Sequence, residues 1–173
     1  MKIAVLGYSG SGKSTLARRL GEITGAAVLH LDRLHFLPDW KEREPEEERA
    51  LLSDFLDSHP AWIIDGNYRS LCYERRLSEA DQIWILLFNR FTRFSRVLLR
   101  YRQYRGKTRP DMAEGCPEKL DVAFARWVLR DCCTPERRER FHDIVRRYPQ
   151  KSHLLTDRFE LETALRLFRE GRL

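Results

Sequence analysis

The chain has 173 residues, of which 42% are hydrophobic and 11% aromatic, so it suits a single folded domain, residues 1–173, and is too apolar to be disordered. Its longest uninterrupted apolar stretch, residues 83–88, is too short to cross a bilayer, so we expect no membrane partner and a cytoplasmic location. The formal net charge is +6, but residues 90–109 alone carry eight Arg and Lys residues and no acidic one, so the positive charge is local.

A short apolar strand is predicted at residues 3–6, and the phosphate-binding pattern Gly-x-x-x-x-Gly-Lys-Ser follows it directly at residues 7–14. A helical pattern then opens at Thr15. This order of strand, glycine-rich loop and helix brings backbone N–H groups and the positive end of a helix dipole to a phosphate. The predicted contacts to ATP are made by Gly7, Ser9, Gly10, Ser11, Gly12, Lys13, Ser14 and Thr15.

Two residues of this loop have predicted chemical roles. Lys13 is expected to contact the β- and γ-phosphates and to act in catalysis, and the Ser14 hydroxyl is expected to bind Mg²⁺. The alternative interpretation is a glycine-rich turn that binds nothing. The fit of every fixed position and of both flanking segments favours phosphate binding.

The next two predicted strands, residues 27–31 and 61–64, are each followed by a carboxylate. Asp65 is expected to hold Mg²⁺ together with Ser14, because a carboxylate on a neighbouring strand often does so beside a phosphate loop. Asp32 is expected to face the acceptor of a phosphoryl group, where it would accept a hydroxyl proton or orient the attacking oxygen. Either aspartate could instead be a helix cap or a turn residue.

The rest of the chain alternates between helical and strand patterns. Further strands are predicted at residues 82–87 and 152–155, and helices at 46–56, 70–79, 91–104 and 159–170, with two more carrying Leu120 to Val128 and Phe141 to Tyr148. This alternation predicts an α/β fold, a five-stranded parallel sheet with helices on both faces. Functional groups are then expected at the carboxyl ends of the strands.

The basic segment is interpreted as part of a lid at about residues 100–121. Arg93, Arg96 and Arg100 share one face of the predicted helix, and we expect Arg100 to contact ATP. Arg105 and Arg109 lie in a turn marked by glycine and proline, and both are candidate catalytic residues that would close over phosphates. The alternative interpretation is a solvated basic helix.

Four sequence blocks, at residues 7–15, 29–32, 62–68 and 104–121, carry a resemblance that spans nearly the full length. The chain resembles the phosphate-loop proteins labelled DNA topology modulation proteins, which are similar to adenylate kinases and other small nucleoside monophosphate kinases. The resemblance implies a P-loop kinase fold with a helical lid insertion and an acceptor-binding segment at about residues 33–60.

The resemblance also bears on individual positions. Adenylate kinases have Asp-Gly-Phe-Pro-Arg after the third strand, and Asp65, Gly66 and Arg69 match that pattern, so Arg69 becomes a candidate catalytic residue that contacts the acceptor or the transferred phosphate. The Thr-Gly-Asp that these enzymes have after the second strand is missing here. Phe36 and Trp40 stand in that region and either stack on a base or pack a small flap, and packing is favoured.

These observations favour an ATP-binding, Mg²⁺-dependent phosphotransferase of the adenylate kinase type, acting on a nucleotide or another small-molecule acceptor, as a monomer or a homodimer. The alternative is a nucleotide-dependent regulatory or DNA-binding protein that affects DNA topology. Nucleic acid is therefore a possible but not favoured partner, since no helix-turn-helix or zinc module is recognisable. A signalling GTPase is disfavoured because its base-reading and switch motifs are missing.

Overall fold

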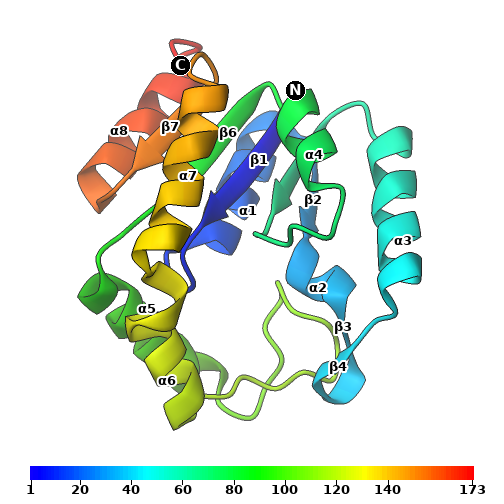
Figure 1. Ribbon diagram of the computed structural model, residues 1–173, viewed down its shortest axis with the longest axis vertical. Helices are drawn as coiled ribbons and strands as arrows, with labels where there is room; N and C mark the ends of the chain where they lie inside the picture. The colour runs from blue at the N-terminus through cyan, green and yellow to red at the C-terminus, as the bar shows by residue number, and fades with distance from the viewer.

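A computed structural model describes all 173 residues and contains the predicted five-stranded parallel sheet (Figure 1). The strands are β1 (Lys2–Gly7), β2 (Ala27–His30), β5 (Trp62–Asp65), β6 (Gln82–Leu86) and β7 (Ser152–Leu155), in the order β2-β5-β1-β6-β7. β1 lies at the centre and pairs with β5 and β6. The predicted fold class is confirmed, and strand β2 ends at His30, two residues before Asp32.

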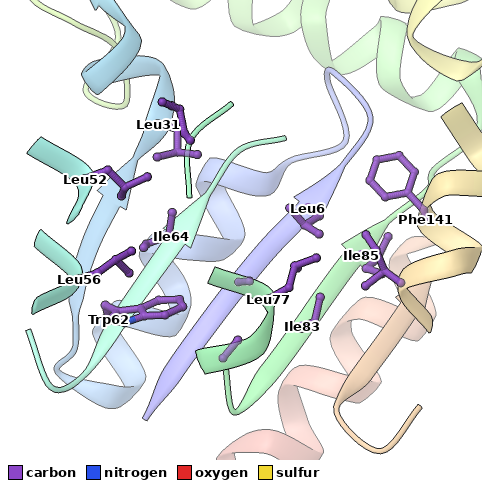
Figure 2. Close-up of a cluster of buried hydrophobic side chains, with 14 of the residues drawn as sticks. Leu6, Leu31, Leu52, Leu56, Trp62, Ile64, Leu77, Ile83, Ile85 and Phe141 are labelled. Carbon is purple, nitrogen blue, oxygen red and sulfur yellow. The ribbon is translucent and has the colours of Figure 1, made fainter. Parts of the chain in front are cut away.

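Helices cover both faces of the sheet, and alternate residues of each strand feed two separate core clusters. On one face, Ile3 and Val5 pack with Leu16 of α1 (Lys13–Thr24) and Leu165 of α8 (Arg158–Arg169). The opposite face is covered by α3 (Pro45–Ser58), α4 (Tyr73–Glu79) and α7 (Pro135–Arg147). Figure 2 shows this second cluster, in which Leu6 and Ile85 of the sheet lie near Phe141 of α7.

The region after β2, where the acceptor-binding segment was expected, contains a short helix and a hairpin. Residues 31–35 form a short helix, α2 (Leu31–His35), which leads into a hairpin of β3 (Phe36–Leu37) and β4 (Lys41–Glu42). Between these strands the 3-10 turn η1 (Pro38–Trp40) places two non-glycine residues, Asp39 and Trp40, at φ values of 63° and 62°. The hairpin is too short to produce a periodic sequence pattern.

The lid consists of α5 (Arg90–Tyr104), an irregular loop, α6 (Val122–Leu129) and the 3-10 turn η2 (Asp131–Cys133). Isolated bridges join Arg105 to Glu118 and Thr108 to Pro117, so the loop folds back on itself. No helix of the structure has the combination of length and apolarity needed to span a membrane.

The lid loop docks on the hairpin through a small apolar cluster. Met112, Ala113 and Cys116 are buried, and the rings of Phe36 and Trp40 pack against them. The Asp39 N–H donates to the Gly115 carbonyl at 3.1 Å. Phe36 and Trp40 therefore pack a flap, which is the favoured one of the two predicted alternatives, and the lid and hairpin form a single cover.

Candidate functional site

A cavity of about 1030 Å³ lies at the carboxyl edge of the sheet, beneath the lid. Its walls come from the phosphate loop and α1, the first turn of the helix after β2, the end of β5 and the loop after it, and the helices α5, α7 and α8. Most of the residues singled out from the sequence line it: Ser9, Gly10, Ser11, Gly12, Lys13, Ser14, Thr15, Asp32, Asp65, Arg69, Arg100 and Arg109. Gly7 and Arg105 do not, and neither does any residue of the expected acceptor-binding segment 33–60.

Gly7 shapes the loop from outside the cavity. Its φ is +137°, and a Cβ there would lie 2.3 Å from the Leu86 carbonyl oxygen, so packing against β6 requires glycine. The Gly7 N–H donates to Asn67 Oδ1 at 3.1 Å, and Asn67 Nδ2 donates to the Gly7 carbonyl at 2.6 Å. Asn67, one of the departures from the adenylate kinase pattern, thus ties the loop after β5 to the phosphate loop.

Lys13 spans the phosphate loop, where its Nζ donates to the Tyr8 carbonyl at 3.1 Å. Burial lowers the pKa of Lys13, although the neighbouring carboxylates of Asp65 and Asp32 act in the opposite direction. The ammonium group is therefore only partly compensated. An anionic ligand in the loop would supply the missing negative charge.

Ser14 and Asp65 meet as the sequence predicted they would. Ser14 Oγ donates to Asp65 Oδ2 at 2.8 Å, and the other carboxylate oxygen, Oδ1, lies 2.5 Å from His30 Nδ1. Asp65 and His30 are both buried and stand opposite each other in the β2–β5 register. His30 was missed in the sequence, although a histidine at the end of an otherwise apolar strand was a usable signal.

The oxygen atoms of Ser14 and Asp65 fit a Mg²⁺ ion, which prefers hard oxygen ligands. No group of three or more His, Cys, Asp or Glu side chains is arranged to hold a metal ion alone. Magnesium commonly binds through one or two protein oxygens completed by substrate phosphates. The donor set therefore suits a cation that arrives with a phosphate ligand.

Asp32 lies in the first turn of α2 instead of at a strand end. It lines the cavity, and the Tyr68 hydroxyl donates to its Oδ1 at 2.7 Å. Burial raises the pKa of Tyr68, and the charge of Asp32 raises it further, so the hydroxyl keeps its proton. One oxygen of Asp32 is thereby fixed while the carboxylate remains at the cavity wall.

Arginine side chains on one face of α5 contact the phosphate loop. Arg93 is fully buried, and its Nη1 donates to the Ser9 carbonyl at 3.3 Å and lies 2.8 Å from Cys132 Sγ. Arg96 Nη1 donates to the Ser11 carbonyl at 2.6 Å. These contacts show that this face is not a solvated basic surface. Two loop carbonyls therefore accept from guanidinium groups, while the N–H groups of Gly10, Gly12 and Lys13 have no protein acceptor and are available to a ligand.

The lid arginines Arg100, Arg105 and Arg109 differ in their exposure and in the groups that they contact. Arg100 Nε donates to Glu118 Oε1 at 2.8 Å, and Arg109 lies 2.6 Å from Glu118 Oε2 and 2.9 Å from Asp111. Burial would raise the pKa of Asp111, but the charge of Arg109 and a backbone hydrogen bond leave it lowered. Arg105 is exposed and stacks on Tyr101, at 6.0 Å from the ring centroid. In this arrangement Arg109 can face a ligand, and Arg105 is remote from the cavity.

The loop that carries Arg69 is held by another arginine that sequence reasoning missed. Arg76 is fully buried without a carboxylate partner, and burial lowers its pKa to about 10. Its guanidinium donates to the carbonyls of Leu71, Gly66 and Tyr68. The backbone from β5 to α4 is therefore fixed from inside, and Arg69 projects into the cavity from a rigid loop.

The chain matches no family model and no curated protein. Among solved structures it is similar over almost its whole length to shikimate kinase from Acinetobacter baumannii in complex with shikimate, with 18% identity, a TM-score of 0.59 and coverage of 98% of this chain and 92% of that one. Shikimate kinase from Bacteroides thetaiotaomicron gives 18% identity, a TM-score of 0.53 and coverage of 99% and 97%. An uncharacterized protein from Eubacterium ventriosum has 17% identity and a TM-score of 0.53, with coverage of 99% of this chain and 98% of that one. These likenesses show a P-loop kinase fold.

Proposed function

We propose that this protein is a phosphotransferase that moves the γ-phosphoryl group of ATP to a hydroxyl of a small-molecule acceptor. The observation that carries the proposal is that a complete phosphate loop, with Lys13 and the Ser14–Asp65 pair, opens into a cavity that Asp32 and Arg69 also line. Catalysis in such sites is mainly positioning and charge stabilisation, and these residues supply both.

In the proposed reaction the acceptor oxygen attacks the γ-phosphorus, the bond from that phosphorus to the bridging oxygen breaks, and ADP leaves. Asp32 accepts the hydroxyl proton, and the hydrogen bond from Tyr68 keeps its carboxylate oriented. Lys13 and Arg109 neutralise charge on the phosphates. Ser14 and Asp65 would hold Mg²⁺, which would supply positive charge to the phosphates.

The lid adds a second requirement for transfer, which is exclusion of water. The cluster of Met112, Ala113 and Cys116 seals the lid loop to the hairpin and leaves the cavity beneath it. Closed lids favour transfer to an acceptor over hydrolysis. The arrangement supports a kinase more than a simple ATPase.

The resemblance to DNA topology modulation proteins suggests the alternative of a nucleotide-dependent DNA-binding regulator. The inward direction of Arg93 and Arg96, which contact the phosphate loop, argues against a DNA-contacting stripe on that face. Binding to duplex DNA that falls steeply with added salt would favour the alternative.

The proposal is tested by incubating the protein with Mg·ATP labelled at the γ-phosphate and a panel of hydroxyl compounds, and by separating the labelled products. A phosphorylated product formed by the wild type and not by Asp32→Asn would support it. Release of inorganic phosphate with no labelled acceptor in any reaction would contradict it.

A further inference from the structure

The cavity extends across the carboxyl edge of the sheet. One end lies beside the helices of one face, α1 and α8, and the other end beside the helices of the opposite face, α4 and α7. At one end Arg18 and Arg19 of α1 meet Arg158 and Glu162 of α8. At the other end Arg69 and Tyr73 lie beside residues of α7. The phosphate loop stands between these ends, so a nucleotide and an acceptor can approach Lys13 from opposite sides. The α4–α7 end also holds Asp32 and Tyr68 on its border with β2.

Three arginines at the α4–α7 end lack a charged partner. Arg69, Arg137 and Arg140 line the cavity and make neither an ion pair nor a side-chain hydrogen bond. In contrast, Arg19 pairs with Glu162, and Arg100 and Arg109 pair with Glu118. Guanidinium groups that converge without a carboxylate leave a concentration of positive charge, which favours an anionic ligand.

The acidic side chains near these arginines do not neutralise them. Four of them border a smaller hollow beside Arg69 and Arg140: Glu74, Glu136, Glu139 and Asp143. Glu74 pairs with Arg147, Glu139 and Asp143 pair with Arg146, and Glu136 is exposed to solvent. Arg137 and Arg140 sit one turn apart at the N-terminal end of α7, where Thr134 caps the helix. Phe141 of the same turn touches Tyr8 of the phosphate loop, with ring centroids 5.6 Å apart. The three arginines therefore lie close to the place of transfer.

The aromatic rings at this end are already covered. Tyr73 and Trp127 pack against the core. Each ring also lies near an arginine: Arg69 is 5.9 Å from the centroid of the Tyr73 ring, and Arg137 is 4.6 Å from the centroid of the Trp127 ring. Phe36 and Trp40 are covered by the lid. No ring here offers a bare face for stacking a nucleobase, so charge is the main basis of recognition.

We infer that the α4–α7 end is an anion-binding acceptor site, formed by Arg69, Arg137 and Arg140, for a small hydroxyl compound that carries a phosphate or a carboxylate and no base. The inference rests on the proposed function, because it assigns the acceptor of the same reaction. It goes further by excluding neutral sugars, nucleosides and base-dependent nucleotide acceptors.

Direct binding tests the site without catalysis. The phosphate loop is filled with Mg²⁺ and a non-hydrolysable ATP analogue, and inorganic phosphate is then titrated by calorimetry. Wild type should bind it, and the double variant Arg137→Gln/Arg140→Gln should bind it roughly 10- to 100-fold more weakly, since charge-assisted hydrogen bonds are lost. The matched control is Arg166→Gln/Arg169→Gln, which makes the same charge change with the same spacing at two exposed positions of α8 that do not line the cavity, and it should bind like wild type.

Equal binding by both double variants, or no phosphate binding to the loaded wild type, would overturn the acceptor site while leaving the kinase proposal standing. Failure of the ATP analogue to bind would overturn both. A transfer assay then shows which anionic group the acceptor carries. Transfer to sugar phosphates would indicate a phosphate and transfer to hydroxy acids a carboxylate, and either result would support the inference. Preferred transfer to neutral sugars, nucleosides or nucleoside monophosphates would contradict the inference.

Discussion

Lys13 holds a positive charge in the phosphate loop at a cost in stability. Its side chain is half-buried, Tyr8 supplies one carbonyl acceptor, and removal from water lowers the pKa of Lys13 below the ordinary 10.5. Between the folded-state pKa and 10.5 the unfolded chain holds a proton that the folded chain lacks. The free energy of unfolding therefore rises with pH in that interval, and below it the charged form costs stability.

We predict that Lys13→Met stabilises the ligand-free protein at pH 7 by roughly 0.5 to 2 kcal/mol, because it removes a half-buried charge that is only partly compensated. The difference from wild type should shrink as the pH rises toward 10.5. Thermal unfolding of both proteins between pH 7 and 10 measures this. A ligand-free variant less stable than wild type at pH 7 would show that Lys13 is not held at a cost.

Asp65 gives a second residue-scale prediction. Asp65→Asn removes the charge beside Ser14 and should weaken the binding of Mn²⁺, used as a spectroscopic substitute for Mg²⁺, at least about tenfold in the presence of ADP. Electron paramagnetic resonance of free Mn²⁺ measures the affinity. Asp32→Asn is the control and should keep the Mn²⁺ affinity while losing phosphoryl transfer. Unchanged Mn²⁺ affinity in Asp65→Asn would remove its metal-binding role.

At the scale of elements, the lid and the hairpin open and close as one unit if their apolar contact holds them together. Met112→Ala should lower the local opening free energy by about 1 to 3 kcal/mol, because the cluster loses its central side chain. Hydrogen exchange should accelerate together in residues 36–42 and 105–119. Val122→Ala, at a lid position that is 87% exposed, should change neither segment. Acceleration in only one segment would contradict the coupling.

The loop from β5 to α4 depends on Arg76 in a comparable way. Arg76→Met leaves the carbonyls of Gly66, Tyr68 and Leu71 without their donor, and we expect a loss of about 3 kcal/mol in the free energy of unfolding. Arg75→Met, which breaks only partly exposed pairs with Asp57 and Glu79, should cost no more than about 1 kcal/mol. Urea denaturation compares the two, and equal losses would contradict the account.

The sequence predicted those elements that a run or a regular spacing of apolar residues marks. The three inner strands, β1, β5 and β6, carry continuous apolar runs because both faces of the sheet are covered there. Helix α2 and the hairpin were not predicted, since they are too short for periodicity and use positive φ values at non-glycine residues. The phosphate loop was readable as a local motif. His30 and Arg93 were not assigned to the site because their partners, Asp65 and Ser9, lie 35 and 84 residues away in sequence.

At the scale of the whole molecule, the fold concentrates its charge in one place. Ten cationic and four acidic side chains line the cavity, an excess of six that equals the formal net charge of the chain. The sequence had suggested that residues 90–109 hold this charge. The structure shows instead that α1, α7, α8 and the loop after β5 contribute to it, so the positive charge is spread along the whole carboxyl edge of the sheet.

The most direct test of the central claim is the thermal stabilisation of the protein by Mg·ATP. At about 100 times its dissociation constant, Mg·ATP should add roughly 2.7 kcal/mol to the wild type, a rise in melting temperature on the order of 5 to 10 °C. Lys13→Met should show little or no rise. An equal rise in wild type and Lys13→Met would mean that ATP binds outside the phosphate loop, and no rise in either would mean that the cavity does not bind ATP.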